Sequence, residues 1–110
     1  MANILCKKNG HNVHIIISGN ATMSFTFKTR DFMKSIVDGE STECHIDLSR
    51  ISEIDIAYLQ LLASFRLTME RYGKKVHFDT VPNNHPFTKF ITQVGLRKDY
   101  FFRESVSYAV

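Results

Sequence analysis

The chain has 110 residues, 44% of them hydrophobic and 23% charged, and a formal net charge of +3. This length suits one domain, residues 1–110, whose core needs neither disulfides nor metal. Mean hydropathy is −0.15, and no apolar run approaches the ~20 residues that span a bilayer, so we predict no insertion into a membrane. The basic residues are scattered rather than gathered in a stripe, which gives no reason to predict nucleic-acid binding. The N-terminus lacks the long apolar region of a signal peptide, so we expect a cytoplasmic protein.

The first predicted elements are two short strands, at residues 3–8 and 12–18, joined by an Asn9-Gly10 pair that favours a hairpin. We expect the second strand to end at Gly19-Asn20 and to turn one apolar face inward, made of Val13, Ile15 and Ile17. Apolar spacing then predicts a helix from near Thr26 to Gly39, with a stripe of Phe25, Phe32, Met33, Ile36 and Val37.

The stretch from Glu43 to Gly73 predicts a strand, a polar loop and the longest helix of the chain. The strand covers residues 43–48, and residues 49–53 are too polar to continue it. Asp55 stands directly before an apolar-periodic run, where its carboxylate can accept the free N–H groups of the first helical turn. The predicted buried stripe of this helix is Tyr58, Leu62, Phe65, Met69 and Tyr72, widened by Leu59 and Leu61.

The last predicted elements are a strand at residues 75–81 and a helix that Asn84 caps, with Pro86 in its first turn and Gly95 at its end. Its predicted buried stripe is Phe87, Phe90, Ile91 and Val94. We expect the aromatic run at residues 100–102 to dock on the core. Two cysteines, Cys6 and Cys44, fall in predicted strands among apolar neighbours, and we interpret both as reduced, buried thiols.

This order of elements predicts an α/β domain with a small mixed β-sheet. The strands joined by helices should be parallel, and the opening hairpin adds an antiparallel strand. One face of the central strands is uniformly apolar, while the other carries His14, His45, Asp47, His77 and Asp79. We therefore expect helices packed mainly on one face, with the other face partly solvated.

A repeated His-x-Asp pattern, His45/Asp47 and His77/Asp79, is the only hint of a metal site, because parallel neighbouring strands can bring these four side chains together. The alternative is that they are ordinary polar residues of a solvated sheet face. No ligand-spacing motif accompanies them, so we assign no metal and no cofactor, and their role stays open. Ser49, Ser52, Cys6 and Cys44 lie in no nucleophile motif, and the glycines form no phosphate-binding loop. We assign no catalytic residue and predict that the chain is not an enzyme.

The segment HIDLSRISEIDIAYLQLLASF resembles the signature of STAS domains, the family of bacterial anti-sigma-factor antagonists and of the cytosolic tails of sulfate transporters. Asp47-Leu48-Ser49 matches the end of the family's strand, Asp55 matches its helix cap, and Leu59, Leu61 and Leu62 match the helix that follows. Residues 87–96, FTKFITQVGL, resemble the family's third helix. The resemblance implies a STAS-like single domain that binds other proteins.

One departure from the family pattern is the residue after the capping Asp55. In the members switched by phosphorylation this residue is a Ser or Thr, whereas here it is Ile56, which has no hydroxyl. The resemblance therefore implies a regulatory interaction module that is not switched at this position. The predicted partner-binding residues are Ser49, Arg50, Ser52, Ile54, Asp55, Ile56, Ala57 and Tyr58, with Tyr58 interpreted either as a core residue or as an interface anchor.

The resemblance leaves the partner open among an anti-sigma kinase, a chemosensory component and a transporter ATPase. Two alternative functions are a small-molecule or nucleotide sensor, which needs a pocket near the chain after Leu48, and an accessory subunit of a lipid-transport ATPase. A displaced phosphorylation site at Ser49, Ser52 or Ser64 also stays open, as does the oligomeric state.

Overall fold

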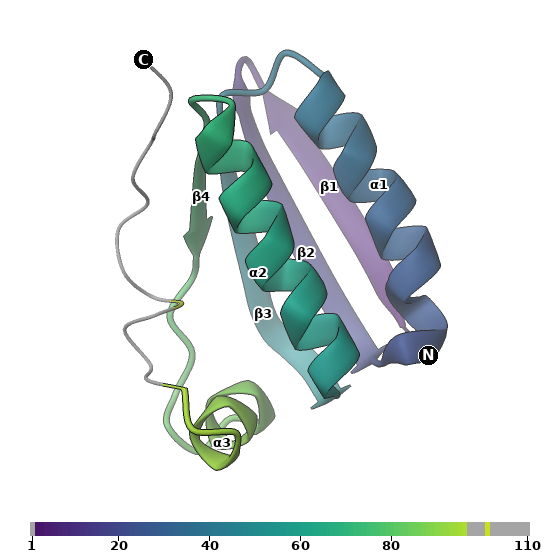
Figure 1. Cartoon of the computed structure of the whole chain (residues 1–110), viewed down its shortest axis with the longest axis vertical. Coiled ribbons are helices and arrows are strands. Elements are labelled where there is room, and N and C mark those ends of the chain that lie inside the picture. The colour runs from purple at the N-terminus through teal and green to yellow at the C-terminus, as the bar shows by residue number, and fades with distance from the viewer. Residues whose placement is uncertain (1, 97–100, 102–110) are drawn as a thin grey trace.

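The computed structural model describes residues 2–96 and 101, which form a four-stranded sheet, three α-helices and one 3-10 turn (Figure 1). The elements in chain order are β1 (Asn3–Asn9), β2 (Asn12–Ala21), η1 (Met23–Phe25), α1 (Thr26–Asp38), β3 (Glu43–Ile54), α2 (Ile56–Arg71), β4 (Lys75–Phe78) and α3 (Pro86–Gln93). The predicted α/β class and the predicted order of elements are both confirmed.

The sheet has the strand order β1-β2-β3-β4. β1 pairs antiparallel with β2, while β2 with β3 and β3 with β4 pair in parallel, so the mixed sheet is confirmed. The hairpin is confirmed as well, with Asn9 paired to Asn12 and the turn at Gly10 and His11. Gly10 has a φ of +63°, a conformation that glycine adopts without steric cost.

β3 runs on to Ile54, so the prediction of a polar loop at residues 49–53 was wrong. The pairing of β3 with β2 explains the error, because β3 holds one extra residue at each of two places. Between Asp47 and Arg50, β3 advances by three residues while β2 advances by two, and between Ile51 and Glu53 it advances by two residues while β2 advances by one. Each extra residue is a bulge that puts two exposed residues in a row and breaks the alternation expected of a strand. β2 likewise continues past the predicted end at Gly19-Asn20.

α1 and α2 lie side by side across one face of the sheet, and α3 lies beyond the end of the strands (Figure 1). The core fills the space between this face and the helices, with Val13, Ile15, Ile17, Cys44, Ile46 and Leu48 from the sheet at most 1% exposed. The other face carries His45, Asp47 and His77, which are half-buried. The predicted one-sided packing of helices is confirmed.

The predicted apolar stripes of α2 and α3 each extend one residue too far. Tyr72 is 66% exposed and Val94 is 40% exposed, whereas the earlier members Tyr58, Leu62 and Met69 are fully buried. Tyr72 and Val94 are the C-terminal caps of α2 and α3, where the backbone leaves the helix and turns the side chain away from the core. Gly73 and Gly95 follow them with φ of +76° and +85°, as helix-ending glycines do.

Three further expectations need correction, and a fourth, the docking of the aromatic run, is confirmed at Phe101. Cys6 is exposed, because β1 is an edge strand, while Cys44 is buried as predicted. β4 ends at Phe78 rather than at residue 81. His85 rather than Asn84 caps α3, its Nδ1 accepting the Phe87 N–H at 3.1 Å, and Pro86 opens the helix as expected. Of the aromatic run at residues 100–102, Phe101 is buried, and the other two residues lie outside the described part.

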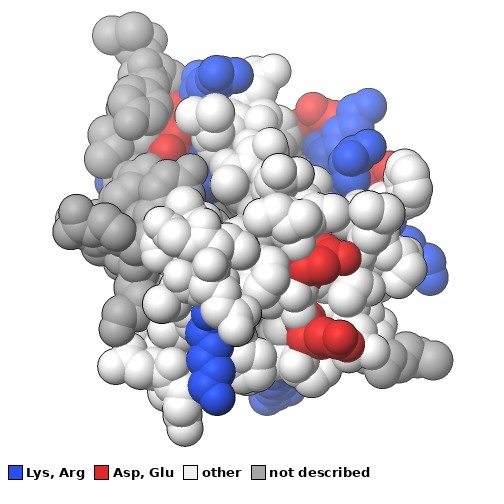
Figure 2. Space-filling model, turned by 60° about the horizontal axis from the view of Figure 1, so that its bottom comes forward, with Lys and Arg blue, Asp and Glu red and all other residues white. Residues whose placement is uncertain are grey.

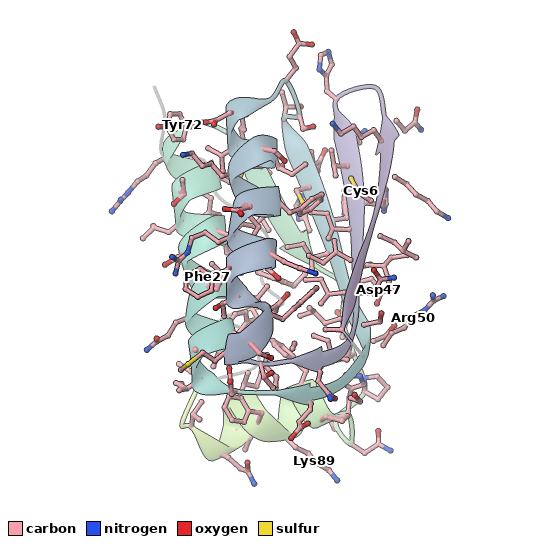
Figure 3. The ribbon with its side chains drawn as sticks, turned by 90° about the vertical axis from the view of Figure 1, so that its right-hand side faces the viewer. Cys6, Phe27, Asp47, Arg50, Tyr72 and Lys89 are labelled. Carbon is pink, nitrogen blue, oxygen red and sulfur yellow. The ribbon has the colours of Figure 1, made fainter. Side chains whose placement is uncertain are left out.

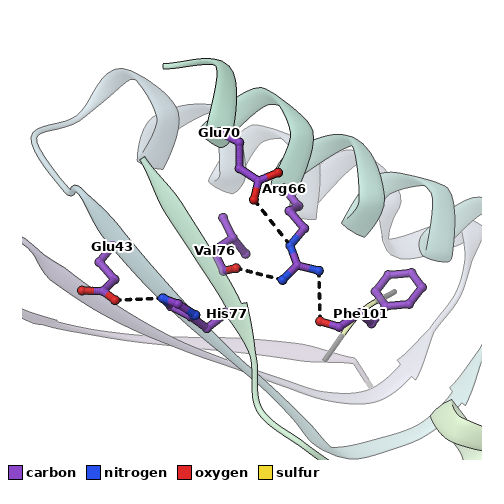
Figure 4. Close-up of polar contacts among 6 residues, drawn as sticks. All are labelled: Glu43, Arg66, Glu70, Val76, His77 and Phe101. Atoms are coloured by element: carbon purple, nitrogen blue, oxygen red, sulfur yellow. Dashed lines mark hydrogen bonds and ion pairs between the residues drawn. The ribbon is translucent and has the colours of Figure 1, made fainter. Parts of the chain in front are cut away.

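A buried ion pair on α2 ties the helix to β4 and to Phe101 (Figure 4). Arg66 and Glu70 are 3% and 1% exposed, with Nε and Oε2 4.0 Å apart. The guanidinium donates to the carbonyls of Phe101 at 3.0 Å and Val76 at 3.2 Å, and it lies 5.1 Å from the centre of the Phe78 ring. The spacing of apolar residues did not indicate that this charged pair is buried.

Candidate functional site

Asp55 caps α2, as predicted, and it also holds the preceding 3-10 turn. Its Oδ1 accepts the Tyr58 N–H at 3.0 Å, and its Oδ2 accepts the Met23 N–H at 2.7 Å. The negative charge also suits the positive end of the helix dipole. Both carboxylate oxygens are thus used inside the domain, so Asp55 fixes the position of η1 relative to the first turn of α2.

Tyr58 lies in the core, which decides between its two predicted roles. Its side chain is 0% exposed, its hydroxyl is 2.9 Å from the Thr29 hydroxyl, and its ring stacks on Phe25 with 6.3 Å between centroids. Burial raises the pKa of Tyr58 to about 12, against a smaller lowering by the hydrogen bond with Thr29. Ile54 is also buried, at 8% exposure, so these two members of the predicted set do not belong to a surface.

The other residues around the start of α2 form an exposed apolar surface. Ile56 is 50% exposed, Met23 is 65% and Phe27, at the start of α1, is 70%, while Ala57 is half-buried. We call Met23, Phe27, Ile56 and Ala57 the α2-start surface. Figure 2 shows the end of the molecule that carries the start of α2 and α3, where most of the surface is uncharged.

A groove between α1 and α2 continues from this surface. Its first part is lined by Met23, Thr26, Arg30, Ala57, Gln60, Leu61 and Ser64, and its second part is lined by Arg30, Met33, Lys34, Val37, Leu61, Ser64, Phe65 and Thr68. Arg30, Leu61 and Ser64 lie in both parts. This groove is on the helical side of the domain and not at the chain after Leu48, where the sensing alternative expects a pocket.

Ser49, Arg50 and Ser52 are exposed on the bulged half of β3, away from the α2-start surface. Figure 3 shows Asp47 and Arg50 on the side of the sheet opposite α1 and α2. The Asp47 carboxylate accepts the Ser49 N–H at 2.8 Å, and the Ser52 hydroxyl donates to Asn20 at 3.0 Å. Of the eight predicted partner-binding residues, three thus lie on the bulged half of β3, two lie in the α2-start surface, two lie in the core, and Asp55 is the half-buried cap of α2.

Local contacts also hold the Asp47 side chain in its charged form. Partial burial alone would raise its pKa, but the hydrogen bonds from Ser49 and the nearby charge of Arg50 lower it below the ordinary value. His85 joins α3 to this stretch, because its Nε2 donates to the Ser49 carbonyl at 2.8 Å while its Nδ1 accepts from α3. The bulged half of β3 is thus a braced strand end rather than a loose loop.

The predicted cluster of His45, Asp47, His77 and Asp79 is brought together only in part. The rings of His45 and His77 stack with 4.8 Å between centroids, but the carboxylate beside them is that of Glu43, which accepts from His77 Nε2 at 2.8 Å (Figure 4). Asp47 instead accepts the Ser49 N–H. The missed partner, Glu43, stands at the start of β3, two residues before His45 and on the same face.

Comparison with known families decides what kind of domain carries these surfaces. The profile of the family described as "Mlab, STAS domain" matches residues 4–104. The chain belongs to the STAS domain family. The resemblance carried by residues 45–65 is thereby confirmed. Among curated proteins, none matches the sequence of this STAS domain.

Solved structures share the fold of this STAS domain at low sequence identity. An anti-sigma factor antagonist from Mycobacterium paratuberculosis superposes with a TM-score of 0.77 at 16% identity, covering 94% of this chain and 84% of that one. The anti-sigma factor antagonist SpoIIAA in its unphosphorylated form gives 0.65 at 15% identity, covering 86% and 84%. A protein from Shewanella loihica with a SpoIIAA-like fold gives 0.58 at 12% identity, covering 99% and 84%.

Within residues 2–96 and 101, this STAS domain contains no helix that is both long and apolar enough to cross a bilayer.

Proposed function

We propose that this STAS domain is a non-enzymatic docking module of a bacterial regulatory pathway, acting in the cytoplasm, which binds a protein partner through the α2-start surface. The observation that carries the proposal is the exposure of three large apolar side chains at the starts of α2 and α1, Ile56 at 50%, Met23 at 65% and Phe27 at 70%, where the Met23 N–H is bonded to Asp55. Apolar side chains that are grouped at a surface, rather than scattered, are typical of protein interaction sites. Membership of the STAS family supports the same kind of function.

Ile56 also determines how the docking is regulated. It occupies the position at which phosphorylation-switched members of the family carry a hydroxyl, and an isoleucine cannot accept a phosphoryl group. We infer that binding at this surface is constitutive with respect to residue 56. The partner stays open among an anti-sigma kinase, a chemosensory component and a transporter ATPase, because an apolar surface fits each of them.

The sharpest test replaces Ile56 by aspartate, which introduces a charge into the α2-start surface. An acidic residue in the first turn of a helix is favourable for the helix dipole, so the fold should survive. Leu67→Asp is the matched control, because Leu67 lies on the same helix and is 45% exposed, outside the α2-start surface. Partners captured from native lysate by the wild-type chain are identified by mass spectrometry and then titrated with each variant.

We expect Ile56→Asp to weaken binding of the captured partner by about ten-fold or more, since central apolar contacts typically contribute more than 1 kcal/mol. Leu67→Asp should bind like the wild type. Equal affinities for the two variants would place the recognition surface elsewhere, with the exposed bulged half of β3 as the next surface to test.

Asp55 should act on binding indirectly, by holding η1 in place. Asp55→Ala removes a helix cap worth about 1 kcal/mol of folding free energy and frees the Met23 N–H, so we expect lower stability and weaker binding. Asp55→Asn keeps an oxygen for the cap and should retain more of both. If Asp55→Asn lost binding as fully as Asp55→Ala while staying as stable as the wild type, the carboxylate itself would contact the partner.

A further inference from the structure

The face of the sheet that α1 and α2 leave uncovered carries a row of three imidazoles, and strand register creates it. β2, β3 and β4 are parallel neighbours, and their pairing sets His14 opposite His45 and His45 opposite His77. Directly paired residues point to the same side of a sheet. The ring centroids lie 4.9 Å apart for the first pair and 4.8 Å for the second, with planes 12° and 21° from parallel. The imidazoles therefore form a stack across three strands.

Glu43 adds a carboxylate beside two members of this stack. It precedes His45 by two residues on β3 and so faces the same side. Its Oε1 lies 2.8 Å from Nε2 of His77 and 3.8 Å from Nε2 of His45. The three ligand atoms all lie within 4.8 Å of one another. The side chains are 37%, 30% and 24% exposed for Glu43, His45 and His77, so solvent reaches them while β-strands fix their backbones.

We propose that Glu43, His45 and His77 bind one divalent transition-metal cation of the zinc class. Two imidazoles and one carboxylate are a set of protein ligands that zinc accepts, with water in the fourth position. Ligand distances of about 2.0–2.1 Å in tetrahedral geometry put the ligand atoms about 3.3 Å apart. The distances of 2.8 and 3.8 Å from the Glu43 oxygen lie on either side of that value, and all three ligand atoms lie within 4.8 Å of one another. Because an imidazole lone pair lies in the plane of its ring, at least one of the stacked rings of His45 and His77 must also turn out of the stack for both nitrogens to point at one ion.

The ligand types also determine which cations the site selects. Imidazole nitrogens suit Zn²⁺, Cu²⁺ and Ni²⁺, whereas Mg²⁺ and Ca²⁺ require oxygen ligands. His14 is the third imidazole of the row, but it lies on the far side of the His45 ring and outside the set of converging atoms. It is therefore the matched control for the two ligating histidines.

Binding requires one proton to move. The Nε2 of His77 donates its hydrogen to Glu43 in the metal-free arrangement, and that nitrogen must lose the hydrogen before it can bind a metal. The proton goes to Nδ1 of the same ring or, from a doubly protonated ring, to solvent. A change of tautomer at His77 is thus a specific spectroscopic sign of this site, which a loosely attached surface ion would not produce.

A bound metal would cross-link two strands. Glu43 and His45 lie on β3, and His77 lies on β4, the four-residue strand at the edge of the sheet. A metal held by both strands stabilises the folded state, because the unfolded chain does not hold these ligands together. The α2-start surface lies on the helical side of the domain, so the metal and the proposed partner do not compete for the same residues.

The test is a titration of the full chain with zinc chloride in a non-chelating buffer, followed by calorimetry and by NMR of the histidine rings. We expect saturable one-to-one binding, shifts of the His45 and His77 ring signals with a tautomer change at His77, and unshifted His11 and His85 signals. Saturating zinc should raise the melting temperature by roughly 5 °C, and EDTA should reverse the rise. Excess Mg²⁺ should not displace the zinc.

Variants make the assignment specific to these residues. His45→Gln and His77→Gln should each weaken zinc binding by about ten-fold or more, and Glu43→Gln should weaken it too, while His14→Gln stays close to the wild type. The proposal is overturned by the lack of saturable binding below about 1 mM zinc. It is equally overturned if His14→Gln weakens binding as much as His77→Gln, or if His11 or His85 shifts in place of His45 and His77. The ring signals of the wild-type chain give this answer even where a variant folds poorly.

Discussion

The two faces of the sheet carry side chains that became neighbours for different reasons. Under α1 and α2, Ile15, Ile46 and Val76 are buried to 1% exposure or less, and many other apolar side chains in the same positions would pack there. On the opposite face, His14, His45 and His77 stack only because three strands pair in one register. A buried apolar face tolerates changes of chemistry that preserve volume, whereas a row of imidazoles depends on which residues stand opposite one another.

The largest expected difference between the faces appears at alkaline pH, because the titrating groups with raised pKa lie on the helix-covered side. Burial, together with the nearby Cys6 thiol, raises the pKa of Cys44 from 9.0 to about 12, and burial raises that of Tyr58 from 10.0 to about 12. A raised folded-state pKa contributes stability that is complete below the unfolded pKa and is lost as pH rises through the folded one. We therefore expect stability to fall between pH 9 and 12.

Cys44→Val separates the thiol from other alkaline effects. The difference of about 3 pKa units at Cys44 corresponds to roughly 4 kcal/mol, so the variant should lose several kcal/mol less than the wild type between pH 9 and 12. Urea unfolding at several pH values measures this loss. Cys6→Ser is the control, and it should follow the wild type closely because burial is the larger cause at Cys44. Parallel curves for wild type and Cys44→Val would mean that the thiol ionises freely in the folded state.

The buried ion pair on the helix-covered side should give the next largest effect. Glu70→Ala leaves the Arg66 guanidinium in the core without its carboxylate, and breaking a buried pair in this way costs about 3–5 kcal/mol. Chemical denaturation at pH 7 measures the loss. On the open face, Glu43→Ala removes a carboxylate that is 37% exposed, and we expect a loss below about 1 kcal/mol. Equal losses would show that the open face contributes as much as the core.

Most of the helix-covered face could be predicted from local patterns. Val13, Ile15 and Ile17 alternate in the sequence as they do in the sheet, and Asp55 precedes the apolar run that it caps. These features are short-range, so a few neighbouring residues contain the necessary information. Cys6 shows where prediction from local patterns fails. An edge strand and an inner strand can have the same apolar pattern, but helices and neighbouring strands bury the inner strand more completely.

The candidate sites depend on contacts that no local pattern contains. Residues 49–53 read as a loop because two bulges break the alternation, and a bulge is visible only in the pairing with β2. The α2-start surface combines Ile56 with Met23 and Phe27, some thirty residues earlier, through the hydrogen bond from the Met23 N–H to Asp55. Glu43 on β3 accepts a hydrogen bond from His77 on β4, a contact between strands that the sequence does not reveal. The His-x-Asp pattern therefore suggested aspartates as the partners of the histidines, although a glutamate contacts them.

Adjacent residues on β3 offer the most direct comparison of the two faces. Ile46→Ala removes a fully buried side chain between the sheet and the helices, and such changes cost about 2–5 kcal/mol. His45→Ala, one residue earlier, removes a half-buried ring whose contacts are cross-strand stacks worth about 0.2–1 kcal/mol each. Both replacements introduce alanine into the same strand, and differences in β-propensity are within about 1 kcal/mol, so most of the remaining difference reports the face. Urea unfolding of the metal-free chain should therefore rank Ile46→Ala well below His45→Ala in stability, and a loss at His45 as large as that at Ile46 would mean that the imidazole row supports the fold itself.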